Sequence, residues 1–265
     1  MSQELKNSNY SQDSSFQEKL YKYILTIADN SLILGQRMGE LCGHGPSLET
    51  DIACTNISLD LLGQVRSYYQ YAAKIAGDGR TEDTIAMLRK EREYVNVLLV
   101  EQPNTDFAYT MARHFFFDVF HEMFLEKLTK SKDLTLAAIA EKSLKEVRYH
   151  VRFSSDWIKR LGDGTEESHT RMQAAIDDLW PYTDELFHQT EACKAMMESG
   201  IGVDTEALRD NYYQQVAEIL TEATLEVPEN NYFHKGGKEG IHTEHMGYIL
   251  AELQYMQRTY PGMEW

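Results

Sequence analysis

The sequence predicts an all-α protein whose core consists of two long helical hairpins. Along most of the 265 residues, apolar side chains recur at the three- and four-residue spacing of amphipathic helices. Only 5 prolines and 16 glycines interrupt the chain, which leaves room for few turns. The clearest breaks separate long periodic segments, as in a helical bundle rather than a sandwich or barrel.

The first hairpin comprises two periodic segments, over residues 16–42 and 48–76. The sequence GHGPS at 43–47 separates them, because a proline and two glycines do not continue a helix. The second segment ends at GDG, residues 77–79. A connection this short makes the two helices antiparallel neighbours.

The second hairpin comprises residues 105–130 and 134–161, with the turn SKD between them. Residues 80–102 connect the two hairpins; they have a shorter helical pattern and end in EQPN. Two hairpins joined by one long crossover form the ferritin-like version of a four-helix bundle.

No linker rich in serine, glycine or proline divides the chain, so we predict one helical domain over residues 17–265. Its C-terminal extension, residues 165–265, contains three or four further helices, with breaks at Pro181 and Pro228. Residues 1–16 are polar, without the apolar segment of a secretory signal, and we expect them to form a flexible tail.

Charge and cysteine content limit the classes of function. A net charge of −16 argues against nucleic acid and anionic membranes as partners, because both require clustered lysine and arginine. No segment approaches the roughly 18 apolar residues that span a bilayer. Three cysteines without a C-x-x-C pair indicate reduced thiols. These features predict a cytoplasmic protein with a solubilising acidic surface; a basic partner protein is the alternative reading of the charge.

Both hairpins place polar side chains at mid-height of the bundle. Residues equally far from a hairpin loop lie at the same height, which sets residues 60–64 opposite 26–30 and Asp118 opposite Glu146. On the third long helix, His114 shares one stripe with Asp118 and two further polar residues. We therefore predict a buried polar layer. Its members are Asp29, Asp60, Gln64, Asp118, His121, Glu122, Glu146 and His150.

The ligand pattern of a di-iron bundle is broken twice in this layer. Such bundles use one glutamate from each of two helices and Glu-x-x-His from each of the other two. Here Leu61 and Gln64 occupy that pattern on the second helix, and Val147 stands three residues before His150 on the fourth. We predict no metal ligands and no catalytic residues, and a hydrogen-bonded layer instead. A self-sufficient di-iron oxygenase, an iron-handling protein and a homo-oligomeric structural bundle are the alternatives.

Three short motifs favour ordinary structural roles. ELFH at 185–188 matches Glu-x-x-His once, outside the four long helices, so packing is favoured over metal ligation. HTEH at 242–245 is typical of a helix N-terminus, with a metal site as the alternative. KGGK at 235–238 is a glycine loop with two cations, which indicates an anion contact.

Several segments resemble a known family. They are GELCGHGPSLETDIACTNISLDLLGQVR, EREYVNVLLVEQPN, KEVRYHVRFSSDW, GGKEGIHTEHMG and LAELQYMQRTYPGMEW. They are similar to the C subunits of bacterial phenylacetyl-CoA 1,2-epoxidases, the multicomponent monooxygenases of aerobic phenylacetate catabolism. The resemblance extends over residues 21–265.

This resemblance implies a ferritin-like, non-catalytic subunit without a cofactor of its own. It would bind and stabilise the catalytic A subunit, which carries the di-iron centre and binds phenylacetyl-CoA. A reductase subunit with flavin and iron–sulfur groups would supply electrons from NADPH, and further epoxidase subunits would complete the complex. The resemblance also implies contacts near the acyl-CoA, at the interface, from Glu93, Tyr94, Val95 and Asn96. The alternative is that these four residues only pack the crossover.

Overall fold

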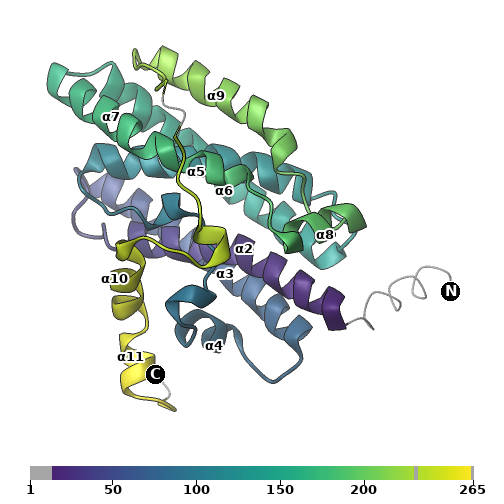
Figure 1. The fold of residues 1–265 in the computed structure, drawn as a ribbon. Coiled ribbons are helices and arrows are strands. Elements are labelled where there is room, and N and C mark those ends of the chain that lie inside the picture. The colour runs from purple at the N-terminus through teal and green to yellow at the C-terminus, as the bar shows by residue number, and fades with distance from the viewer. Residues whose placement is uncertain (1–13, 230–231, 264–265) are drawn as a thin grey trace.

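The computed structural model describes residues 14–229 and 232–263, and four long helices form its centre (Figure 1). They are α2 (Ser14–Gly39), α3 (Leu48–Ala76), α5 (Phe107–Leu128) and α6 (Leu134–Gly162). Helix α2 pairs with α3, and α5 pairs with α6, as two hairpins. The described residues contain no strand, and the predicted all-α, ferritin-like bundle is confirmed.

The bounds of the four helices agree with the predicted ones to within three residues. Helix α2 begins at Ser14, so the last residues of the predicted flexible tail, 14–16, are helical. The remainder of that tail, residues 1–13, lies outside the described residues. No helix in the described part of the chain is long and apolar enough to cross a membrane.

Polar side chains fix the starts of three long helices. Ser47, Asp106 and Asp133 each accept a hydrogen bond from a backbone N–H group in the first turn of α3, α5 and α6, respectively. These N–H groups have no partner within the helix, so each cap stabilises its start by about 1 kcal/mol. Gly77 ends α3 with φ of 64°, the left-handed conformation that glycine adopts without a steric penalty.

The crossover between the hairpins is less helical than its pattern predicts. It contains only α4 (Glu82–Met87) and two 3-10 helices, η1 (Glu91–Glu93) and η2 (Leu98–Glu101). The N–H groups of Val95 and Val97 donate to side chains of α2, and that of Leu98 donates to Glu185. The prediction of a helical crossover was therefore wrong for this segment, because tertiary hydrogen bonds replace helical ones.

The described residues of the C-terminal extension form five α-helices, one more than the predicted maximum. They are α7 (Glu166–Leu179), α8 (Glu191–Ser199), α9 (Arg209–Glu222), α10 (Glu244–Leu253) and α11 (Tyr255–Thr259). Helices α7 and α9 cover the second hairpin, whereas α10 lies beside α2 and the crossover (Figure 1). Between α9 and α10 the chain returns across the bundle to the crossover. At Gly237 a Cβ would lie 2.2 Å from the Asn96 carbonyl oxygen, so only glycine allows this approach.

Candidate functional site

The structure divides the predicted polar layer between two sites, because the first hairpin has a different register from the predicted one. A Cβ at Gly35 would lie 3.3 Å from Leu61 Cβ, although the predicted register places residue 29 opposite Leu61. The reason is the loop: Gly43 and Gly45 donate their N–H groups to Asp51, so the loop lies beside the first turn of α3. The predicted height of Asp29 was therefore wrong.

The first site is a buried ion pair that anchors the crossover. Asp29 is fully buried and accepts hydrogen bonds from Arg89 Nη1 at 2.9 Å and Nη2 at 2.6 Å. The Tyr69 hydroxyl donates to the same carboxylate at 2.6 Å, and the Val95 N–H at 2.9 Å. The Arg89 guanidinium lies 4.0 Å from the centre of the Tyr94 ring, a cation–π contact. These contacts give Asp29 a structural role.

The second site, called the His114 cluster, comprises His114, Asp118, His150 and Ser154 between α5 and α6. His114 and Asp118 are one turn apart on α5, with 3.4 Å between Nε2 and Oδ1. The Ser154 hydroxyl donates to Asp118 Oδ2 over 2.9 Å. His150 Nε2 donates to Asp60 Oδ2, on α3, over 3.1 Å. Sequence reasoning placed His114 on the correct stripe but left it out of the layer.

Burial controls the protonation of this cluster. Desolvation raises the pKa of Asp118 well above its usual value, although the Ser154 hydrogen bond opposes it. Desolvation likewise holds the pKa of His114 well below its usual value, and nearby His150 adds to the effect. The imidazole of His114 is therefore neutral at physiological pH, as a metal ligand or hydrogen-bond acceptor must be.

The other predicted members lie at the rim of the cluster. The buried face of α6 runs through Val147, His150 and Ser154, whereas Glu146 is half-buried and accepts a hydrogen bond from Gln64 Nε2 at 2.9 Å. The prediction that Glu146 points into the core with His150 was therefore wrong, since the face is centred nearer to Val147. Glu122 is half-buried as well and forms an ion pair with an exposed arginine of α6.

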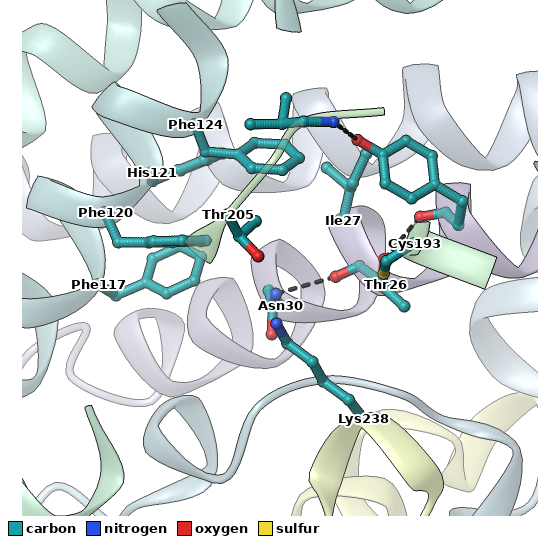
Figure 2. Close-up of a pocket in the computed structure, with 12 residues that line it drawn as sticks. Thr26, Ile27, Asn30, Phe117, Phe120, His121, Phe124, Cys193, Thr205 and Lys238 are labelled. Atoms are coloured by element: carbon teal, nitrogen blue, oxygen red, sulfur yellow. Dashed lines mark hydrogen bonds between the residues drawn. The ribbon is translucent and has the colours of Figure 1, made fainter. Parts of the chain in front are cut away.

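His121, two helical turns after His114, lines a small cavity (Figure 2). Phe117, Phe120 and Phe124 lie around His121, and Asn30 and Lys238 line the same cavity. Desolvation lowers the pKa of His121 to about 3, so it is neutral. The cavity has a volume of about 30 Å³, which accommodates roughly one water molecule. It is far too small for an acyl-CoA.

The four residues predicted near an acyl-CoA alternate between surface and interior. Tyr94 and Asn96 are fully buried. Glu93 and Val95 instead line an open cleft of about 500 Å³, together with several cations of α2 and the crossover. Asn96 Nδ2 donates to Glu101, a buried carboxylate that sequence reasoning missed.

Glu101 links the crossover to the C-terminal extension. It pairs with His242 Nδ1 at 2.5 Å and accepts the Thr243 N–H at 2.9 Å. Burial lowers the pKa of His242, but the hydrogen bond and charge of Glu101 raise it by more, so the net shift is upward. Thr243 precedes the first residue of α10, which agrees with the predicted helix start. The motif HTEH therefore serves to hold α10 on the crossover.

The remaining two motifs also have structural contacts. Glu185 is fully buried and accepts the N–H groups of Leu98 at 2.7 Å and Gly236 at 2.8 Å, as a packing role predicts. Lys238 is buried, and its ammonium group donates to two backbone carbonyls at 2.8 Å. The predicted anion contact is therefore wrong for Lys238, because its charge is already used inside the protein.

The fold and the cluster define a ferritin-like helical bundle in which the di-iron ligand pattern is incomplete. The chain belongs to the phenylacetic acid catabolic protein family, whose family model matches residues 3–265. It is similar to the C subunit of the 1,2-phenylacetyl-CoA epoxidase of Escherichia coli (strain K12), with 51% identity over 247 residues. The aligned region covers 93% of this chain and 99% of that relative. The family resemblance predicted from the sequence is confirmed.

Proposed function

We propose that this chain is a non-catalytic, cytoplasmic subunit of a multicomponent phenylacetyl-CoA epoxidase in phenylacetate catabolism. It binds and stabilises the catalytic A subunit, which holds the di-iron centre, and a flavin and iron–sulfur reductase supplies that subunit with electrons. The observation that carries this proposal is the residue set at the di-iron positions. Leu61 and Val147 are fully buried where carboxylate ligands would be required. The residues present do not fit a di-iron centre.

An exposed apolar stripe on α3 supports the docking of a partner subunit. Leu48, Ile52, Leu59 and Leu62 lie on one face of the helix, at spacings of four, seven and three residues. Their exposed fractions are 71%, 51%, 61% and 37%. Leucines on an outward face lower the solubility of a free chain, and they are typical of a surface that a partner covers. We assign this stripe to the A subunit.

The open cleft beside the crossover supports contact with the acyl-CoA at the interface. Glu93 and Val95 share it with Lys19 and Arg92, and with Lys22, which pairs with Glu18 at 2.7 Å. In a chain of net charge −16, these cations provide a local site for an anion. The phosphates of coenzyme A match that charge, and a volume of about 500 Å³ is within the range of small-molecule sites.

Affinity for the A subunit tests the proposal. We expect the wild-type chain to co-elute with the A subunit, and Ile52→Asp/Leu59→Asp to weaken the complex by about 30-fold or more, as loss of a central contact of about 2 kcal/mol implies. Leu134→Asp is the matched control, because Leu134 is 75% exposed on α6. Binding of the double variant at wild-type strength would exclude the stripe. Substrate turnover by this chain alone, with two irons bound, would contradict the non-catalytic role.

A further inference from the structure

We propose that His114, Asp118 and His150 bind one divalent transition-metal ion, in a mononuclear site that differs from a di-iron centre. One ring nitrogen from each histidine and one Asp118 oxygen all lie within 4.8 Å of one another. The three side chains are fully buried. Metal–ligand bonds of about 2.0–2.2 Å place neighbouring ligand atoms roughly 3–3.6 Å apart. The 3.4 Å between His114 Nε2 and Asp118 Oδ1 already matches that spacing.

The same three side chains carry unpartnered polar atoms. Within the described part of the chain, His114 Nε2, Asp118 Oδ1 and His150 Nδ1 are buried without a hydrogen-bond partner. Buried polar atoms almost always have a partner, so three orphans on adjacent side chains require an explanation. A single ion would supply a partner to a ligand atom of each of the three residues.

Neighbouring side chains orient these ligands as outer-sphere groups do in known metal sites. Asp60 accepts the Nε2–H of His150 at 3.1 Å, which leaves Nδ1 as the nitrogen with the free lone pair. Ser154 donates to Asp118 Oδ2 at 2.9 Å and leaves Oδ1 free. The Asp60 side chain is 36% exposed, so this outer-sphere group lies at the solvent-facing edge between α3 and α6.

Charge and donor type favour a transition metal. With neutral histidines, a divalent cation and two carboxylates, those of Asp118 and Asp60, sum to zero charge. A buried carboxylate requires such compensation, and the nearest partners of Asp118 are an imidazole and a hydroxyl. Two nitrogens and one carboxylate suit Zn²⁺, Fe²⁺ or Co²⁺ better than Mg²⁺ or Ca²⁺, which prefer oxygen ligands only.

This inference departs from the metal-free layer that the sequence predicts, because it depends on His114 joining the cluster. It concerns this chain alone and does not rest on the proposed role in an epoxidase. Partner binding and metal binding are measured separately, so either proposal fails without the other.

Titration of the metal-stripped, full-length, untagged chain with Co²⁺ tests the site. We expect one Co²⁺ per chain, visible absorption bands of a nitrogen-ligated ion, and a higher melting temperature with the ion bound. His114→Gln should abolish the bands, and Asp60→Ala should weaken binding by about 10- to 100-fold. His121→Gln is the matched control: it removes another buried histidine of α5 but should leave Co²⁺ binding unchanged.

Two results would overturn the inference. One is a wild-type chain with no Co²⁺ bands and no metal-dependent change in melting temperature, which would indicate water molecules in the cluster. The other is Co²⁺ binding by His114→Gln that equals the wild type. Circular dichroism checks that each variant is folded. If His114→Gln does not fold, Asp60→Ala provides the decision, because Asp60 lies at the half-exposed rim.

Discussion

Replacing Asp29 with alanine should destabilise the protein strongly, because it leaves a buried cation without its partner. The Asp29 carboxylate accepts two hydrogen bonds from Arg89, one from the Tyr69 hydroxyl and one from the Val95 N–H. After the substitution, the Arg89 side chain, only 8% exposed, keeps its charge in an apolar interior. Breaking a buried ion pair in this way costs about 3–5 kcal/mol. For a chain of this size that corresponds to a fall in melting temperature of roughly 10 °C.

Chemical denaturation of the wild type and of Asp29→Ala measures this difference. Asp78→Ala is the matched control, since Asp78 also pairs with an arginine, Arg80, but at the exposed surface, where ion pairs contribute little. Hydrogen exchange adds a local readout, because the Val95 amide should lose protection before the bundle helices do. A loss of stability no larger than that of the control would refute the assignment of Asp29 as the anchor of the crossover.

Three further outcomes follow from the contacts described above. Gly237→Ala should destabilise the fold by more than about 1 kcal/mol, because the new Cβ would overlap a carbonyl oxygen of the crossover. Gly63→Ala should instead stabilise the fold by up to about 1 kcal/mol, because a Cβ at this position of α3 meets open space. Thermal unfolding measures both changes. Because the pKa of His242 is raised in the folded state, its ion pair with Glu101 stabilises the fold fully below about pH 6.5. This contribution is lost as pH rises through the folded-state pKa. A profile of unfolding free energy against pH should show this loss for the wild type and lack it for His242→Gln. Lys19→Glu/Arg92→Glu should raise the KM for phenylacetyl-CoA in the reconstituted complex and leave kcat unchanged. An unchanged KM would place the CoA outside this cleft.

The four long helices were predictable because their signals are local. The apolar period and the breaks at GHGPS and GDG fix α3 as residues 48–76, and the structure agrees. The crossover was not predictable in the same way, since its backbone N–H groups bond to Asp29, Asn30 and Glu185 on distant elements. No local pattern reports such partners, and hydrogen bonds from tertiary contacts outweigh a weak helical propensity.

The candidate site was predictable as a set of residue types but not as a geometry. The stripe on α5 indicated that His114, Asp118 and His121 are close to one another in angle. Which of them meets His150 depends on the register of two hairpins, and the loop contacts of Asp51 changed the first of these by more than one helical turn. Side chains two turns apart on one helix then separate into a cluster and a cavity, as His114 and His121 do.

Helix α3 connects the two proposals, because its opposite faces serve the partner and the polar cluster. Leu59 and Leu62 point outward, whereas Leu61 and Gln64 are buried against the bundle. Asp60 lies on the flank between these faces, half-exposed and bonded to His150. A partner docked on the stripe would lie against this flank and cover Asp60, the half-exposed neighbour of the His114 cluster. We therefore expect bound Co²⁺ to exchange more slowly in the complex than in the free chain. Equal exchange rates would show that the partner leaves Asp60 open to solvent.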